Sequence, residues 1–266
     1  MTGNDKAGLA FFLDLAGDYL SGGFKRLHTE YSFSDDSRVS VQKTPVEPRN
    51  GENSLSSQQS LKEIAEEIAS CTGCGLCKTR INTVPGEGPP NPLVMVIGEG
   101  PGAEEDATGR PFVGRAGQLL DRMLDSKGRI GLSRSTNCYI ANIVKCRPPG
   151  NRNPQQDEIC ACVPFLAKQI TILKPKMILA AGNTAVKTLL DSSEGITRLR
   201  GIVTAFRGTM LMNGEFNIPL LPTFHPSALL RDETLKTPVW EDLKTLRAKL
   251  CELDEEYAAR MADVPL

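Results

Sequence analysis

A glycine-rich stretch between an apolar run and a helical segment constrains the fold of this chain most strongly. Residues 93–97 (LVMVI) have the length and continuous hydrophobicity of a strand buried on both faces. Residues 98–117 contain six glycines, two prolines and three consecutive acids, and residues 118–124 then show helical apolar spacing. Open α/β sheets bind ligands in such loops, at the carboxyl ends of parallel strands. The stretch therefore predicts a ligand pocket in an α/β domain.

The loop lacks the composition of a nucleoside-triphosphate site. No Lys-Ser or Lys-Thr pair follows its glycines, as a phosphate-binding P-loop requires. Glu99 lies inside the motif, where its charge would repel a bare phosphate. The aromatic ring of Phe112 instead predicts a pocket for a neutral, planar group.

Alternating strands and helices continue along the chain. Strands are predicted at 93–98, 138–144, 177–182 and 218–224, and helices at 115–127, 155–173, 183–191 and 240–257. This order is typical of a parallel sheet with helices on both faces. Residues 197–216 interrupt this order. They predict a small antiparallel excursion from the sheet, with strand-like residues at 203–206 and 209–212 and a turn dipeptide at 213–214.

The two ends of the chain differ from its middle. Residues 7–20 predict an amphipathic helix that packs on the main domain or on a partner, and the polar residues 32–60 predict a flexible linker. A short helix is predicted at 61–70, before the first cysteines. We therefore divide the chain into residues 1–60, a domain at 61–257 and an acidic tail at 258–266.

Composition narrows the class of protein. With 40% hydrophobic and 24% charged residues, the chain is typical of a soluble globular protein. Its apolar runs fall short of the roughly 20 residues that a spanning helix needs, and Asp14 and Asp18 interrupt the N-terminal apolar segment, unlike a secretory signal. The net charge of −1 divides into −4 for residues 1–70, +7 for 71–250 and −4 for 251–266. A basic centre is compatible with a polyanionic ligand.

Eight cysteines without an export signal predict a reducing compartment and a metal site in place of disulfides. A CxxC pair is followed by further cysteines at suitable spacing, and the candidates are Cys71, Cys74, Cys77, Cys146, Cys160 and Cys162. Four thiolates suffice for a [4Fe–4S] cluster or a Cys₄ zinc site, and the spacing leaves both open. Cys138 and Cys251 are predicted to be small buried apolar residues.

Four ordered blocks of the chain resemble the family 4 uracil-DNA glycosylases, the iron–sulfur branch of the uracil-DNA glycosylase superfamily. The blocks are CTGC (71–74), GEGPGAEEDATGRPFVGRAGQLL (98–120), NIVKCRPPGNRNP (142–154) and FHPSALLR (224–231). The resemblance implies a three-layer α/β/α sandwich around a four-stranded parallel sheet. It also implies a structural [4Fe–4S] cluster on Cys71, Cys74, Cys146 and Cys162, with Cys77 and Cys160 as non-ligands.

The family's reaction hydrolyses the N-glycosidic bond of deoxyuridine and leaves an abasic site in single- or double-stranded DNA. Uracil inside a duplex is unreachable, so the nucleotide must first rotate out of the helix into a pocket. The resemblance implies that Phe112 stacks on the base and that Asn142 pairs with uracil O4 and N3–H and rejects cytosine. Gly100 and Glu105 would complete the pocket, with Glu105 crowding the C5 edge and excluding thymine.

Breaking the bond develops positive charge on the sugar and negative charge on the departing uracil. Glu99 would position water or stabilise the sugar cation, and His225 would bind the developing oxyanion. Leu229 and Leu230 would supply an apolar wedge in the DNA, and Arg231 would meet a phosphate. We expect a monomeric, cytoplasmic, nucleoid-associated enzyme of bacterial type.

Three other functions each fit part of the sequence. Sibling glycosylases that trap uracil-DNA covalently have a basic insertion ending in histidine after CRPP, whereas here CRPPGNRNPQQDE follows. A [4Fe–4S] electron carrier would leave Phe112, Asn142 and His225 unexplained. A zinc-stabilised nucleic-acid-binding module without catalysis would be distinguished by metal analysis and a turnover assay.

Overall fold

The computed structural model describes residues 52–125, 128–208 and 216–265. Contacts divide the chain into Met1–Glu47 and Pro48–Leu266, and every described residue belongs to the second unit. The helix predicted at 7–20 and the linker predicted up to residue 51 lie outside the described residues.

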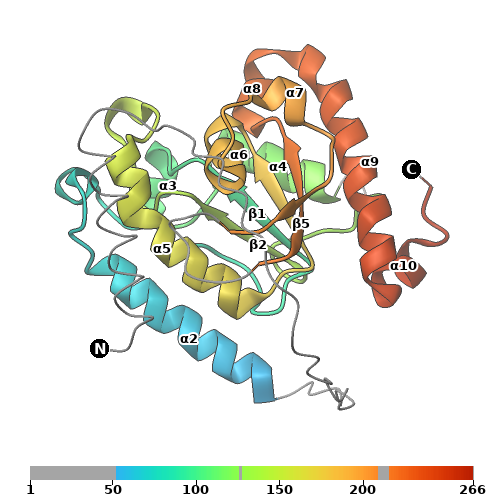
Figure 1. The fold of residues 1–266 in the computed structure, drawn as a ribbon, viewed down its shortest axis with the longest axis horizontal. Coiled ribbons are helices and arrows are strands. Elements are labelled where there is room, and N and C mark those ends of the chain that lie inside the picture. The colour runs from blue at the N-terminus through green and yellow to red at the C-terminus, as the bar shows by residue number, and fades with distance from the viewer. Residues whose placement is uncertain (1–51, 126–127, 209–215, 266) are drawn as a thin grey trace, which may run out of the picture. The chain divides into compact units, whose positions relative to one another are not determined.

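A five-stranded sheet lies at the centre of the described part of the chain (Figure 1). Its strands, in the spatial order β2-β1-β3-β5-β4, are β1 (Val94–Gly98), β2 (Cys138–Asn142), β3 (Met177–Ala181), β4 (Thr204–Phe206) and β5 (Ile218–Thr223). Neighbours among β2, β1, β3 and β5 are parallel, and β4 pairs antiparallel with β5 at one edge. The four predicted parallel strands are confirmed. The predicted excursion supplies the edge strand β4, while residues 209–215 lie outside the described residues.

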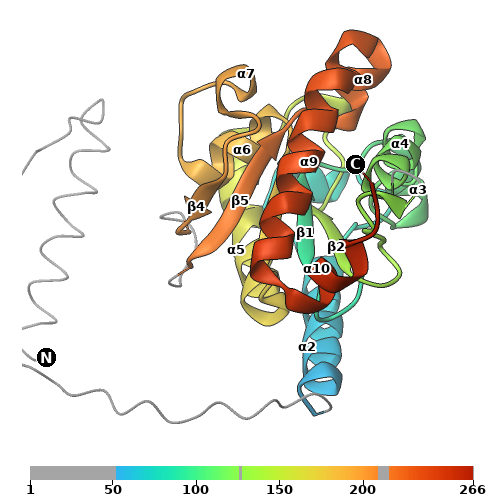
Figure 2. The ribbon, with the colours of Figure 1, turned by 90° about the vertical axis from the view of Figure 1, so that its right-hand side faces the viewer.

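Helices cover both faces of the sheet because its central strands are apolar at every position. Met95 and Ile97 pack into one core and Val94 and Val96 into the other. The first core contains residues of α5 (Gln156–Leu173) and α6 (Asn183–Leu190). The second contains residues of α4 (Arg115–Asp125), α8 (Pro226–Arg231), α9 (Lys236–Leu253) and α10 (Glu255–Met261), and Figure 2 shows α9 lying along the sheet. The predicted three-layer α/β/α sandwich is confirmed.

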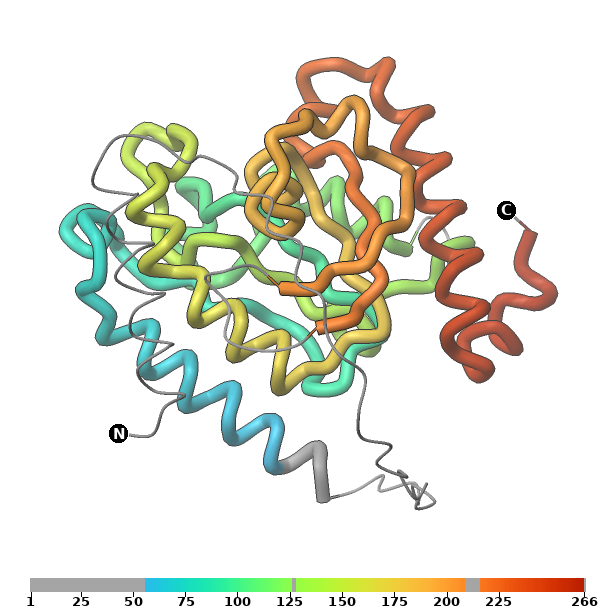
Figure 3. Tube along the Cα trace, viewed as in Figure 1, coloured from blue at the N-terminus to red at the C-terminus, as the bar shows by residue number. Residues whose placement is uncertain are grey.

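Helix α2 (Glu52–Ala69) is longer than predicted and packs against α5 as an outer layer (Figure 3). The prediction of a flexible linker is therefore wrong for residues 52–60. Ile64 and Ile68 are buried and anchor the helix. Once the buried turns at the C-terminal end of the helix have formed, each further residue adds a backbone hydrogen bond. The polar residues before them can therefore extend the helix toward its N-terminus.

The C-terminal helix is divided in two. Asp254 lies between α9 and α10, where its side chain accepts a hydrogen bond from the backbone N–H of Tyr257 at 2.6 Å and caps α10. Met261 is buried at the end of α10. Residues 258–261 are therefore part of the domain, and the predicted tail is wrong for them.

Several short helices have no counterpart in the predictions. They are α3 (Ala103–Thr108), α7 (Ile196–Leu199), α8, and the 3-10 helices η1 (Gly75–Lys78), η3 (Pro149–Asn151) and η4 (Glu233–Leu235). Within the described ranges, no helix combines the length and hydrophobicity needed to cross a membrane.

The sheet topology creates a crevice at one end of the strands. Strands β1 and β3 are neighbours, but α4 follows β1 and packs on one face while α6 follows β3 and packs on the other. Connections that leave adjacent strands toward opposite faces open a crevice at the carboxyl edge. The segments that carry the residues predicted to bind or cleave deoxyuridine begin at this edge.

Candidate active site

A cleft of about 660 Å³ lies at the carboxyl ends of β1, β2, β3 and β5. This volume is in the range typical of small-molecule sites, roughly 300–1,000 Å³. Seven of the predicted site residues line it, namely Glu99, Gly100, Glu105, Phe112, Asn142, His225 and Arg231. The structure thus brings together residues separated by more than a hundred positions in the sequence.

Asn142 is the last residue of β2 and is 1% exposed. In the part of the chain that the structure describes, its Oδ1 is the one buried side-chain polar atom without a hydrogen-bond partner. Leaving such an atom unpaired costs about 1–3 kcal/mol. An acceptor kept unpaired at the floor of a cleft is suited to a ligand that supplies an N–H group.

Gly98, at the end of β1, allows two pocket side chains to approach the backbone. A Cβ atom there would lie 2.5 Å from Asn142 Oδ1 and 2.5 Å from Phe112 Cζ. Any larger residue would displace one of them. Glycine at this first position of the motif is therefore explained by the close packing of the two side chains against the backbone. A bound phosphate is not required to explain it.

Phe112 and His225 form an aromatic wall of the cleft. Their ring centroids lie 5.5 Å apart, and their planes are inclined by 35°. Phe112 is 5% exposed and has a φ of 52°, in the left-handed region that residues with a side chain rarely adopt. Its backbone is therefore held by neighbouring groups.

Glu105 has both carboxylate oxygens bound to the backbone. Oε1 accepts from the N–H groups of Val113 and Gly114, both at 2.9 Å, and Oε2 accepts from Gly102 at 3.0 Å. The side chain thus fixes the loop that carries Phe112. Exclusion of thymine by Glu105 stays a prediction.

His225 precedes α8, and its hydrogen bonds determine which ring nitrogen carries the proton. Nδ1 accepts from the backbone N–H of Ser227 at 3.2 Å, so a neutral ring is protonated on Nε2. Burial, with a smaller contribution from the charge of Arg231, lowers the pKa of His225 from 6.5 to about 4. Near pH 7 the ring is therefore a neutral hydrogen-bond donor.

Glu99 follows β1, and its Oε2 accepts a hydrogen bond from the hydroxyl of Thr184 in the first turn of α6. Sequence reasoning missed Thr184. The available signal was its position just after a predicted strand and a glycine, where open α/β sheets place ligand-binding groups.

The structure separates the two predicted wedge leucines. Leu229 is 2% exposed and packs in the core beneath α8, so its prediction as a DNA contact is wrong. Leu230 is 40% exposed, and Arg231 is exposed and lines the cleft. Successive helical residues point about 100° apart, which explains why one neighbour faces the core and the next faces solvent.

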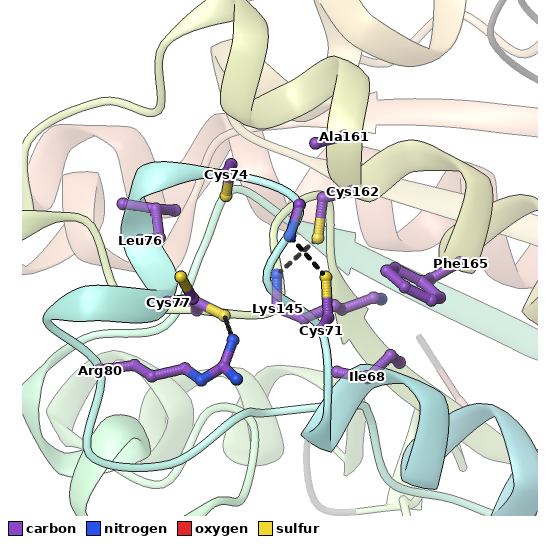
Figure 4. A pocket seen from close by; sticks show the side chains of 12 residues that line it. Ile68, Cys71, Cys74, Leu76, Cys77, Arg80, Lys145, Ala161, Cys162 and Phe165 are labelled. Carbon is purple, nitrogen blue, oxygen red and sulfur yellow. Dashed lines mark hydrogen bonds between the residues drawn. The ribbon is translucent and has the colours of Figure 1, made fainter.

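The cysteines form a second site, which we call the cysteine pocket (Figure 4). Five sulfur side chains line it together with apolar groups such as Ile68, Leu76 and Phe165; they are Cys71, Cys74, Cys77, Cys146 and Cys162. Cys77 thus joins the four predicted ligands, whereas Cys160 is absent from the lining residues that the structure describes. All eight cysteines lie in the described ranges, and none of them forms a disulfide.

Hydrogen-bond donors face the sulfur atoms of the cysteine pocket. Backbone N–H groups of Gly73 and Lys145 donate to Cys71 Sγ at 3.4 Å and Cys162 Sγ at 3.2 Å, and the guanidinium of Arg80 donates to the sulfur of the Cys146 side chain at 3.3 Å. In contrast, burial raises the pKa of the Cys162 thiol to about 11. Ligation of a cationic group would offset that effect and favour the thiolate.

Comparison with known proteins identifies the family. The model of the uracil DNA glycosylase superfamily matches residues 85–244. The chain is 43% identical over 192 residues to the type-4 uracil-DNA glycosylase of Sulfurisphaera tokodaii, covering 71% of this chain and 84% of that protein. It is 41% identical over 194 residues to that of Thermotoga maritima (72% and 95% covered) and 42% identical over 187 residues to that of Pyrobaculum aerophilum (69% and 91% covered). The chain belongs to the type-4 uracil-DNA glycosylase family.

In this type-4 family member, Lys145 links the cleft to the cysteine pocket. Its Nζ donates to the backbone carbonyl of Asn142 and to Gln169 Oε1, both at 2.8 Å, while its backbone N–H donates to Cys162. Lys145 is 1% exposed, and burial lowers its pKa to about 8. Sequence reasoning missed this residue, because lysine is rarely buried. The available signal was its position directly after an apolar run (NIVK).

Proposed function

We propose that this chain is a monofunctional uracil-DNA glycosylase that hydrolyses the N-glycosidic bond of deoxyuridine and leaves an abasic site. Membership of the type-4 family supports the removal of uracil from DNA. One observation carries the assignment at the level of residues, namely the unpaired, buried Oδ1 of Asn142 beside an aromatic ring and a neutral histidine. The catalytic residues we propose come from one chain, which is compatible with action as a monomer.

The base is recognised through shape and hydrogen bonding after the nucleotide leaves the helix. Phe112 stacks on the flat face of the ring. Asn142 accepts from uracil N3–H through Oδ1, and its amide NH₂ donates to O4. Cytosine would place an acceptor at N3 against Oδ1, so two buried acceptors would lack partners, each at a cost of about 1–3 kcal/mol.

Bond cleavage is assisted by two groups on either side of the glycosidic bond. His225 donates from Nε2 to the oxyanion that develops on the departing uracil. Because its pKa is about 4, the ring acts as a neutral hydrogen-bond donor near pH 7 and not as a general acid. Glu99, held by Thr184, places a negative charge or an ordered water near the sugar as its positive charge grows.

DNA contacts are proposed for the two exposed residues at the end of α8. Leu230 is 40% exposed and would fill the space vacated by the rotated nucleotide. Arg231, at the rim of the cleft, would bind a phosphate.

Cys71, Cys74, Cys146 and Cys162 are proposed to hold a [4Fe–4S] cluster. The support is that these side chains line one pocket with hydrogen-bond donors directed at three of their sulfurs. Among the described residues, no group of three His, Cys, Asp or Glu side chains is placed to hold a single metal ion. When bound, the cluster would crosslink three parts of the chain, namely the segment before β1, the loop after β2 and α5.

A defined oligonucleotide assay tests the function. Purified protein is incubated with a strand containing one uracil and, in parallel, with strands containing cytosine or thymine at that position, and abasic sites are cleaved with alkali. We expect cleavage of the uracil strand alone. The matched control is Asn142→Leu prepared identically, which detects contaminating glycosylase. A stable protein–DNA adduct on a denaturing gel, or equal activity of the control, would overturn the proposal.

A further inference from the structure

The aromatic ring that we place against uracil belongs to a residue with a strained backbone. Phe112 has a φ of 52°. A side chain makes this left-handed conformation costly, and such residues persist only where the surrounding structure holds them. Strain of this kind concentrates at ligand-binding sites, and the groups that hold the strained backbone therefore determine where the ring lies.

Arg134 holds the carbonyl side of this segment. Its Nη1 donates to the backbone oxygen of Pro111 and its Nη2 to that of Phe112, both at 2.9 Å. On the other side, the next two N–H groups donate to the carboxylate of Glu105. The two carbonyl oxygens, which carry partial negative charge, thus face the guanidinium of Arg134. The two N–H groups, which carry partial positive charge, face the carboxylate of Glu105.

Arg134 is itself rigidly placed. It lies in the turn before β2, where Ser133 N–H donates to Asn137 Oδ1 at 2.8 Å. Its guanidinium also donates to Asp121 Oδ1 of α4, from Nε at 3.0 Å and from Nη2 at 2.8 Å. The Arg134 side chain is 14% exposed and is not among the described residues that line the cleft. It therefore reaches Phe112 from behind the pocket.

Helix α4 closes the remaining space around the strained residue. A Cβ atom on Gly117 would lie 1.8 Å from the carbonyl oxygen of Phe112. The first turn of α4 thus packs directly on the carbonyl that Arg134 binds. Only a glycine at this position lets helix, carbonyl and guanidinium meet.

We infer that Arg134 is a positioning residue that holds Phe112 in its base-stacking conformation without touching the substrate. The inference rests on the proposed function, because it assigns Arg134 a role in uracil capture. It predicts that Arg134 influences excision only through the Phe112 ring.

A double-mutant cycle tests this inference with single-turnover excision of uracil. Arg134→Met keeps side-chain length but removes every donor, and we expect a rate reduction of roughly 10- to 100-fold, since the strained conformation then relaxes. In a Phe112→Ala background the same substitution should reduce the rate less than about twofold. Inhibition by free uracil should weaken in parallel in the first background and stay unchanged in the second.

Arg247→Met is the matched control. Arg247 also donates to backbone carbonyls, those of Arg129, Met261 and Val264, but it is a buried residue of α9 and does not line the cleft in the described part of the chain. We expect it to lower the melting temperature while the excision rate stays within about twofold of wild type. A loss of rate equal to that of Arg134→Met would show that general destabilisation explains both.

Three results separate the possible failures. An equal rate loss for Arg134→Met in both backgrounds, or no loss in either, would overturn the inference. Absence of uracil excision by the wild-type chain would overturn the proposed function instead. If Arg134→Met does not fold, Arg134→Lys supplies the test, because one ammonium cannot reproduce the planar guanidinium fork. Arg134→Lys should then show the same dependence on Phe112, and a rate equal to wild type would overturn the inference.

Discussion

The cleft and the cysteine pocket differ in whether their hydrogen-bond acceptors are paired, although Asn142 and Cys146 are only four residues apart. In the cleft, Oδ1 of Asn142 is buried and lacks a partner within the described residues. In the cysteine pocket, the sulfurs of Cys71, Cys146 and Cys162 each accept a hydrogen bond from the protein. A site that binds and releases a base keeps an acceptor free, whereas a site that retains a group satisfies its ligands permanently. Substitutions in the cleft should therefore alter the rate of uracil excision. Substitutions in the cysteine pocket should alter the metal content and stability of the protein.

The largest expected effect is loss of the proposed cluster from the cysteine pocket. Protein purified without oxygen should contain about four iron and four acid-labile sulfide per chain. Cys146→Ala should lose the iron, because a ligand is missing, whereas Cys77→Ala should keep it although Cys77 also lines the pocket. Iron, sulfide and zinc analysis measures this, and stoichiometric zinc in an unreconstituted anaerobic sample would refute the iron–sulfur assignment.

In the cleft, His225→Ala should have the largest effect on rate. Removal of one pre-placed donor to a developing oxyanion typically costs roughly 2.7–4 kcal/mol, or a factor of about 100–1000. Single-turnover excision should fall by that factor, while binding to uracil-DNA should stay within a few-fold because phosphate contacts dominate affinity. A 5-fluorouracil substrate, whose leaving group is a better anion, should lose less. Abolished DNA binding with an unchanged rate would make His225 a DNA contact.

The depressed pKa of His225 links its neutrality to stability. The pKa is about 4 in the folded chain, whereas the unfolded chain has the ordinary histidine value of 6.5. Between these values the unfolded chain binds a proton that the folded chain does not, so stability decreases as the pH falls from 6.5 toward 4, by at most about 3 kcal/mol. Urea unfolding between pH 7.5 and 4.5 should show a steeper loss for wild type than for His225→Gln. Identical pH dependence in the two proteins would contradict the assignment of a neutral imidazole to the folded chain.

Asn142→Asp tests the amide donor that lies beside the unpaired acceptor. The substitution replaces the amide donor with an acceptor opposite uracil O4, so we expect excision to slow by roughly 10- to 100-fold. Cytosine excision should increase weakly at most. Parallel single-turnover assays on the two bases measure this, and unchanged uracil excision would remove Asn142 from the recognition site.

The smallest expected effect concerns the exposed leucine at the rim. Leu230→Ala should slow excision from duplex DNA by a few-fold to about tenfold, because the stack left by the rotated nucleotide is no longer filled. A single strand has no such stack, so excision from it should stay within about twofold. Equal slowing on both substrates would argue against a wedge.

Motifs and local patterns account for the residues that we propose contact the base. Phe112, Asn142 and His225 lie in sequence blocks of distinctive composition, and each lines the cleft as predicted. The residues that hold this set in place were not predicted. Thr184 lies 85 positions from Glu99, and Arg134 lies 22 positions from Phe112. An arginine in a turn or a threonine at a helix start is too common to mark a role until its partner is known.

The sequence by itself determined the layered architecture, because continuous apolar runs fit only strands that are covered on both faces. It also determined where the ligand loops lie, since parallel strands bring their carboxyl ends to one edge. Tertiary structure alone decided that Leu229 is core and Leu230 is exposed, because the rotation of α8 about its axis depends on packing against α4. It likewise decided that residues 52–60 are helical, since burial of Ile64 and Ile68 stabilises a segment whose own composition favours disorder.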